Sequence, residues 1–115
     1  MQYALLIYSE PGAMESLSPA EREAMSAEFL ALRDVPGVFS GAGLQPVTTA
    51  TTIRLADGKP LVTDGPFADT KEVLGGYYLV EAENLDRATE VAARIPMLRL
   101  GGSVEIRPLL PGEKP

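Results

Sequence analysis

The stretch GGYYLVEAENLDRATEVAARIP, Gly75–Pro96, predicts a strand followed by a capped amphipathic helix. Residues 76–82 are apolar on both faces, which is typical of a strand that is covered on both sides. Asn84 stands at a helix N-cap position, and a proline follows the helix predicted for residues 85–95. The predicted buried stripe of this helix has helical spacing and consists of Leu85, Ala88, Val91, Ala92 and Ile95. A strand predicted for residues 103–109 completes a strand–helix–strand unit.

The N-terminal part of the chain predicts the same order of elements. Residues 2–8 form a strand that is again apolar on both faces, and a helix over residues 20–33 precedes a short strand over residues 38–44. Ser18 is placed as the N-cap of this helix, with a proline in the first helical position and Glu21 where a capping box needs its acid. The predicted buried stripe consists of Met25, Phe29 and Leu32.

A β-hairpin is predicted between these two units, from a strand over residues 48–55, a turn at 56–59 and a return over 60–63. Two strand–helix–strand units with right-handed crossovers make an α+β ferredoxin-like sandwich, with two helices on one face of an antiparallel sheet. The other face would be bare although its strands are apolar on both sides. We therefore expect a homodimer of the dimeric α+β barrel type, in which two sheets pack face to face.

The composition excludes several classes of site. The chain has 115 residues, which suits one domain, predicted over residues 1–110 with a polar tail at 111–115. It contains no cysteine and no histidine, which removes thiol catalysis, the Ser-His-Asp relay and almost any zinc site, so we predict no metal and no cofactor. A net charge of -6 argues against nucleic-acid binding. No segment predicts a membrane span or an export signal, so the predicted location is cytoplasmic.

The stretch TDGPFADTKE, Thr63–Glu72, concentrates three carboxylates and one lysine. One interpretation is structural: Asp64 accepts backbone hydrogen bonds and fixes a turn, and Phe67 anchors the loop in the core. The other is functional, because carboxylates held close together can take different pKa values and act as acid and base. Under this interpretation the candidate catalytic residues are Asp69, Lys71 and Glu72.

A second candidate site is the bare face of the sheet, which the alternation of residues assigns to Tyr77, Glu81, Glu105 and Arg107. Charges in an apolar space between sheets must be paired or solvated, so one interpretation is an ion pair or a wet rim of the interface. The other is a polar cleft for an anionic small molecule. The candidate ligand-binding residues from this face and from the motif are Arg54, Asp64, Phe67, Tyr77 and Arg107.

The motif Thr63–Glu72 resembles the signature of the DGPF group of the YCII-related proteins, with Asp69 where glutamate is commoner. Similar stretches extend along the chain: Tyr3–Tyr8, Gly43–Pro46, Thr51–Arg54, Gly75–Leu79 and Gly102–Pro108. The resemblance implies a ferredoxin-like α+β domain that is usually dimeric, in a group without an established biochemical function. A histidine and aspartate pair thought to act in related YCII proteins cannot be carried over, because this chain has no histidine.

Two hypotheses of function follow. The first is a homodimer that binds or transforms a small molecule between the sheet face and the motif loop. The second is a non-catalytic protein-interaction or regulatory module whose dimer surface or motif loop docks a partner. A pocket that gathers several polar groups would favour the first, and a flat, exposed loop would favour the second.

Overall fold

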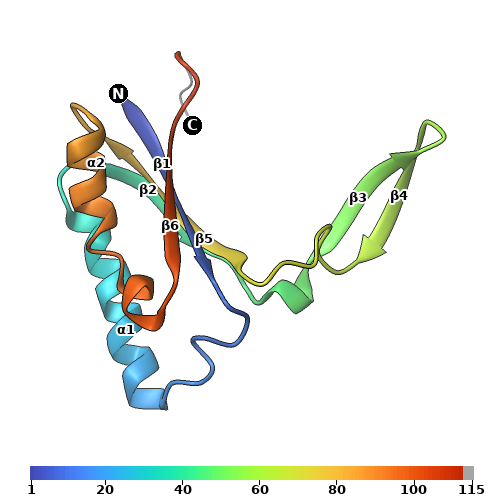
Figure 1. Cartoon of the computed structure of the whole chain (residues 1–115), viewed down its shortest axis with the longest axis horizontal. Coiled ribbons are helices and arrows are strands. Elements are labelled where there is room, and N and C mark those ends of the chain that lie inside the picture. The colour runs from blue at the N-terminus through green and yellow to red at the C-terminus, as the bar shows by residue number, and fades with distance from the viewer. Residues whose placement is uncertain (113–115) are drawn as a thin grey trace.

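The computed structural model describes residues 1–112, and its main body is built on a four-stranded antiparallel sheet (Figure 1). The strands are β1 (Gln2–Ser9), β2 (Val38–Gly43), β5 (Val73–Glu81) and β6 (Ser103–Pro108), in the order β2-β5-β1-β6. All three neighbouring pairs run antiparallel. This is the predicted ferredoxin-like α+β arrangement. Of the predicted tail, residues 113–115 lie outside the described part of the chain.

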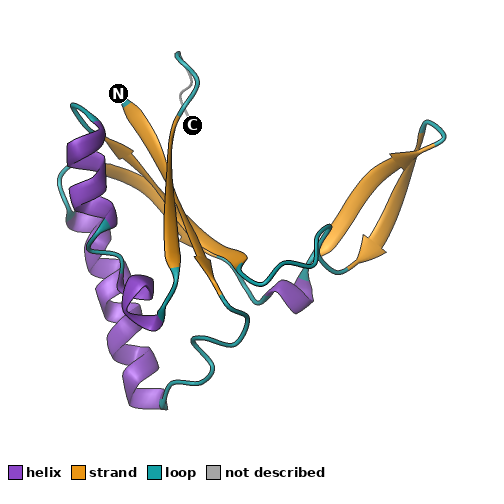
Figure 2. Ribbon diagram, viewed as in Figure 1, coloured by secondary structure: helices purple, strands orange, loops and turns teal. Residues whose placement is uncertain are grey.

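Two helices, α1 (Pro19–Ala31) and α2 (Leu85–Ala92), lie on one face of this sheet (Figure 2). Both predicted N-caps are confirmed. The Glu21 N–H donates to Ser18 Oγ over 3.1 Å, and the Ser18 N–H donates to Glu21 Oε1 over 2.9 Å, which closes a capping box. The Arg87 N–H donates to Asn84 Oδ1 over 3.0 Å. Short 3-10 helices, η1 (Leu32–Asp34) and η3 (Pro96–Leu100), follow the two helices.

The core lies between the helices and the sheet. Alternate residues of β1 and β5 point into it, and the helices contribute the predicted stripes. Leu5, Val80 and Ile95 are its most fully buried large side chains. One prediction for α2 is wrong: Leu85 is 55% exposed, because it is the first residue of the helix, directly after the N-cap, and takes no part in the core. The helix also ends at Ala92, earlier than predicted.

The predicted hairpin forms a separate two-stranded sheet, from β3 (Thr51–Ala56) and β4 (Lys59–Asp64). We call residues 51–64 the arm. It projects away from the body, so that the molecule has the outline of a V (Figures 1 and 2). β3 begins later than predicted, because Val47–Thr49 form a 3-10 helix, η2, where the strand was expected to start.

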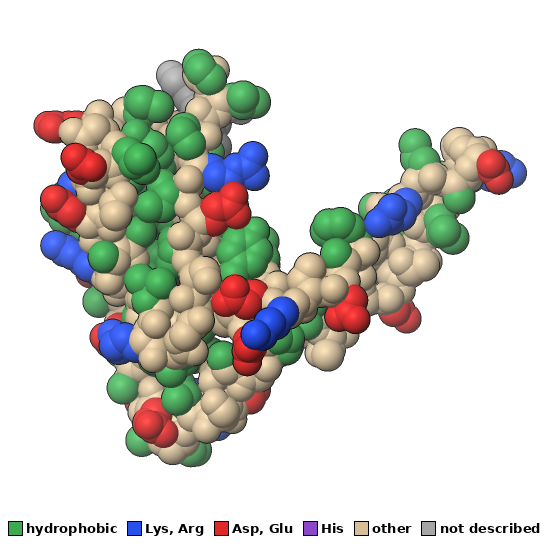
Figure 3. Space-filling view, viewed as in Figure 1, with side chains coloured by type: hydrophobic (Ala, Val, Ile, Leu, Met, Phe, Trp, Pro, Cys, Tyr) green, Lys and Arg blue, Asp and Glu red, His purple; other side chains and the backbone are tan. Residues whose placement is uncertain are grey.

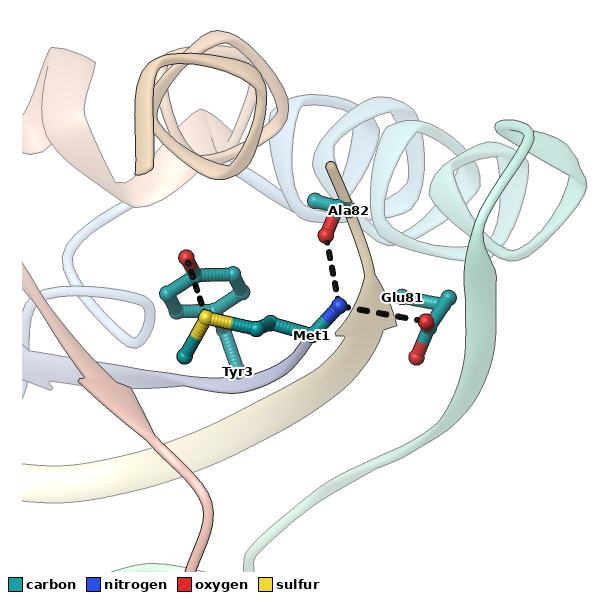
Figure 4. Close-up of polar contacts among 4 residues, drawn as sticks. All are labelled: Met1, Tyr3, Glu81 and Ala82. Carbon is teal, nitrogen blue, oxygen red and sulfur yellow. Dashed lines mark hydrogen bonds and ion pairs between the residues drawn. The ribbon is translucent and has the colours of Figure 1, made fainter. Parts of the chain in front are cut away.

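The face of the main sheet turned away from the helices carries Ala4, Leu6, Tyr8, Tyr77 and Leu79, and we call it the open sheet face. Register places Leu6 opposite Tyr77 and Ala4 opposite Leu79. At its end, the Met1 amino group donates to Glu81 Oε1 over 3.2 Å and to the Ala82 carbonyl over 3.0 Å (Figure 4). The open sheet face and the arm form the two inner sides of the V (Figure 1).

Candidate functional site

The turn at the start of the motif is held by Thr52, not by Asp64. Thr52 Oγ1 donates to the Gly65 carbonyl over 2.7 Å, and the Gly65 N–H donates to the Ala50 carbonyl over 2.8 Å. Gly65 has a φ of +99°, a conformation that favours glycine. Within residues 1–112 the Asp64 carboxylate accepts no hydrogen bond, so its predicted role in fixing the turn is wrong. Asp64 is the exposed last residue of β4.

Phe67 does not anchor the motif in the core, as predicted, because its side chain is 75% exposed. The Arg54 guanidinium carbon lies 5.8 Å from the centroid of its ring, within the range of a cation–π contact. The pairing of β3 with β4 brings the strand that carries Arg54 back to the start of the motif loop. Two predicted ligand-binding residues are therefore neighbours at the root of the arm.

The charged half of the motif lies against the ends of β1 and β6. Lys71 Nζ is 3.8 Å from Glu10 Oε1, and Ser103 Oγ donates to the Glu72 carboxylate over 3.3 and 3.4 Å. Thr70 Oγ1 donates to the Glu72 carbonyl over 2.6 Å. Asp69 and Lys71 are exposed and Glu72 is half-buried, so the three candidate catalytic residues share a loop but no enclosed pocket.

The other two predicted ligand-binding residues, Tyr77 and Arg107, share the open sheet face but are separated by β1. Tyr77 lies opposite Leu6, and Arg107 lies opposite Ala4 on the far side. Arg107 Nε is 3.9 Å from Glu105 Oε2, an exposed pair at the edge of the face. These two charges therefore lie beside each other at the edge of the open sheet face. Arg54 belongs to the arm and takes no part in this face.

A groove that the sequence did not predict runs between α1 and the β2–β5 side of the sheet, with a volume of about 490 Å³. The helix wall of the groove consists of Ser26, Phe29 and Leu30 from α1 and Arg33 from the 3-10 helix η1 that follows it. Across from them lie apolar side chains and a run of glycines: Ile7, Met97, Gly43, Gly75 and Gly76. Glycines leave space because they have no side chain. The glycines of these two strands were therefore the signal in the sequence that could have indicated a groove.

Tyr78 lies in the wall of this groove, and its position depends on Gly41. A Cβ at Gly41 would lie 2.7 Å from Tyr78 Cδ1, so only glycine lets the ring lie across β2. The Tyr78 hydroxyl donates to the Phe29 carbonyl over 2.5 Å. Burial raises the pKa of Tyr78, while the nearby Arg33 lowers it to a smaller extent. The hydroxyl is therefore protonated at neutral pH, and its proton is engaged with the helix backbone.

A second groove, also of about 490 Å³, continues from the first toward the segments 10–15 and 44–48. The two share Ser9, Met14, Leu44, Gly75 and Met97, so they form one continuous depression. Glu10 lines the second groove and is the partner of Lys71. The motif therefore contacts the rim of the depression through the ion pair of Lys71 and Glu10.

Residues 1–112 lack two features that would point to other kinds of site. No group of three or more histidine, cysteine, aspartate or glutamate side chains is placed to hold a metal ion. No helix there is both long enough and apolar enough to cross a membrane.

The antiparallel sheet, with two helices on one face and a groove beneath one of them, defines a ferredoxin-like α+β domain. A family model of the YCII-related domain matches residues 1–112, and the chain therefore belongs to the YCII-related family. An uncharacterised protein of Rhizobium meliloti (strain 1021) is 36% identical over 123 residues, covering 100% of this chain and 99% of the relative.

The fold is also similar to a solved structure of 5-chloro-2-hydroxyhydroquinone dehydrochlorinase (TftG) from Burkholderia phenoliruptrix AC1100, in complex with 2,5-dihydroxybenzoquinone. The TM-score is 0.56 and the identity is 17%, and the match covers 97% of this chain and 96% of that one. At this identity the likeness shows the fold alone.

Proposed function

We propose that this protein binds a small, mainly apolar molecule with an anionic group, in the groove between α1 and the β2–β5 side of the sheet. One observation carries the proposal: the groove has apolar walls and is lined by Arg33, whose guanidinium forms no salt bridge within residues 1–112. Its volume of about 490 Å³ lies in the range of small-molecule sites, roughly 300–1,000 Å³.

The lining suits an aromatic acid, phenol or quinone. Phe29, Leu30 and Met97 offer apolar surface to a flat ring, and Arg33 can donate charge-assisted hydrogen bonds to a carboxylate or phenolate oxygen. Tyr78 is ill-suited to accept a proton from such a ligand, because its pKa is raised and its hydroxyl donates to Phe29. The groove therefore favours binding over proton abstraction by this tyrosine.

The structural neighbour supports the chemical class of ligand. TftG is solved with a small dihydroxyquinone, a flat ring that carries oxygen substituents. The support extends to the kind of molecule and not to the reaction. We also propose a role for the motif residues Asp69, Lys71 and Glu72 at the rim of the depression. There the ion pair of Lys71 and Glu10 can contact a bound molecule.

Isothermal calorimetry with 2,5-dihydroxybenzoquinone and a panel of hydroxybenzoates tests this proposal. We expect Arg33→Gln to weaken binding about tenfold or more, since a hydrogen bond to a charged group contributes about 1.5–3 kcal/mol. Arg22→Gln is the matched control, because Arg22 lies on α1, which directly precedes the 3-10 helix η1 that carries Arg33, and outside the groove. Binding that is equally weak in both variants, or no binding at all, contradicts the proposal and favours an interaction module.

We also propose that the protein is a homodimer joined through the open sheet face. Leu6, Tyr8, Tyr77 and Leu79 stay half-buried there, with no layer covering them within residues 1–112. Burying apolar area of this kind contributes roughly 25 cal/mol per Å². Light scattering at micromolar concentration should give twice 12.2 kDa, and Leu79→Arg should lower that mass. A monomer at all concentrations contradicts the dimer.

A further inference from the structure

The chain exposes more surface than a compact monomer of its size. Its accessible area is 7813 Å², whereas a folded monomer of 12.2 kDa exposes about 6,100 Å². Its radius of gyration is 15.8 Å, against about 13 Å for a compact chain of 115 residues. The excess area is therefore about 1,700 Å², and the projecting arm is its most visible source (Figure 3).

One face of the arm is apolar. Register pairs Ile53 with Val62 and Leu55 with Pro60, and strand alternation puts these four side chains on the same side. Ile53, Leu55 and Val62 are 65%, 74% and 60% exposed, so nothing in the described chain covers them. The neighbouring pairs on the opposite side, which include Arg54 and Lys59, are more polar.

A two-stranded hairpin with an uncovered apolar face is marginal on its own in water. Within residues 1–112, β3 and β4 pair only with each other, and no third strand joins their sheet. Exposed apolar patches rimmed by polar residues mark interaction surfaces. The arm therefore has the chemistry of a segment that is completed by a partner.

We propose that the arm clamps a second copy of this chain, with the face of Ile53, Leu55, Pro60 and Val62 buried against the partner's body. This inference rests on the homodimer proposed above. The arm and the open sheet face are the two inner sides of one V (Figure 1), so a body seated on the open sheet face lies within reach of the arm. In a two-fold dimer the contact occurs twice, so that both arms are covered at once.

The area agrees with this occupant. An excess of about 1,700 Å² on each chain gives about 3,400 Å² for a pair, which lies within the roughly 2,000–5,000 Å² that obligate homodimers bury. The open sheet face alone would leave the apolar face of the arm in water. A different protein seated on the arm is the competing occupant, and the oligomeric state of variants on the two sides of the arm separates the two.

Leu55→Asp and Ala56→Asp test the clamp as a matched pair. The two variants add the same charge at neighbouring positions, but alternation puts Ala56 on the opposite side of the hairpin. We expect sedimentation equilibrium to show the Leu55→Asp dimer weakened at least a hundredfold, because two copies of the contact are lost. The dissociation constant of the Ala56→Asp dimer should lie within a few-fold of the wild-type value. Equal dimer affinity in both variants and wild type overturns the clamp and leaves the sheet-face dimer standing.

A second measurement keeps the test decisive if Leu55→Asp folds poorly. The chain has no cysteine, so Leu55→Cys and Lys59→Cys each accept one thiol-directed, polarity-sensitive fluorophore. In the dimer, the probe at 55 should emit as in an apolar medium and shift to water-like emission on dilution, while the probe at 59 stays water-like throughout. Water-like emission at 55 in a dimer overturns the clamp, and so assigns the arm to another partner. A monomeric wild-type protein overturns both proposals.

Discussion

The hydroxyl of Tyr78 donates a hydrogen bond of 2.5 Å to the backbone carbonyl of Phe29 and so joins a central strand of the sheet to α1. The bond spans the wall of the groove, and Phe29, Arg33 and Tyr78 all line it. A carbonyl near the end of a helix needs a partner when it is buried. The same bond therefore stabilises the domain and sets the width of the proposed site.

The first prediction is that Tyr78→Phe destabilises the domain. Losing this hydrogen bond should cost about 1 kcal/mol and lower the melting temperature by roughly 4–8 °C in thermal unfolding. Tyr3→Phe is the control: Tyr3 is also buried, but its hydroxyl donates only to the Met1 sulfur at 3.7 Å, a weak acceptor (Figure 4). An equal fall in melting temperature in both variants would contradict a specific stabilising role for the hydrogen bond between Tyr78 and Phe29.

The second prediction concerns two glycines of β2. In Gly41→Ala the new methyl group would lie 2.7 Å from Tyr78 Cδ1 and 2.9 Å from the Tyr77 carbonyl oxygen, so we expect a loss of about 1–3 kcal/mol from overpacking. Gly43 has no atom within 4 Å of such a methyl group, so Gly43→Ala should keep its stability.

Gly43 lines the groove, so Gly43→Ala serves a second purpose. Its methyl group should narrow the groove and weaken binding of the dihydroxyquinone while chemical denaturation stays close to wild type. A stable variant with unchanged affinity would argue that the ligand lies elsewhere. Similar stability losses in both glycine variants would contradict the role given to Gly41.

The sheet and the helices could be predicted from the sequence because their signals are local. Ser18, Glu21 and Asn84 marked the helix starts, and the apolar strands marked the centre of the sheet. The 3-10 helix that begins at Pro96 and the early end of α2 could not be predicted, since both depend on the burial of Ile95 and Met97 in the core. Leu85 fits the helical spacing of the buried stripe, but it lies at the first position of α2, where the sheet does not cover it.

The site was harder to predict, because it depends on which segments meet. The charged motif suggested a catalytic cluster, yet the fold spreads Asp69, Lys71 and Glu72 along an exposed loop. The groove depends on residues that carry no chemical signature, namely glycines and one face of α1. Arg33 stood in a helix with other charged residues, and only its position beside Tyr78 distinguishes it.

The third prediction is a contribution of the capping box to stability that depends on pH. Hydrogen bonds from the backbone and the side chain of Ser18 lower the pKa of Glu21 below its ordinary value of 4.5. A carboxylate whose pKa is lower in the folded state than in the unfolded state stabilises the folded state at pH values above its unfolded-state pKa. This stabilisation is lost as the pH falls through the folded-state pKa. Ser18→Ala should therefore have a lower free energy of unfolding than wild type at pH 7. Below about pH 4.5 its free energy of unfolding should fall less steeply with decreasing pH than that of wild type.

Denaturant unfolding between pH 3 and 7 measures this effect. Ser16→Ala is the control, because Ser16 donates to the Ala13 carbonyl and lies outside the capping box. A Ser18→Ala curve that runs parallel to wild type at every pH would contradict the coupling between Ser18 and Glu21.

The fourth prediction is that Thr52, and not a charged residue of the motif, stabilises the turn at the start of the motif. Thr52→Val removes the donor to the Gly65 carbonyl, and the loss of one hydrogen bond should cost about 1 kcal/mol in thermal unfolding. Asp64→Ala should change the melting temperature little, because Asp64 is exposed and accepts no hydrogen bond within residues 1–112. Lys71→Ala should also change it little, since exposed ion pairs contribute at most about 1 kcal/mol. The same variant should alter ligand binding, because Lys71 is paired with Glu10 at the rim of the depression. Asp64→Ala melting well below Thr52→Val would reverse this assignment and return the turn to the aspartate.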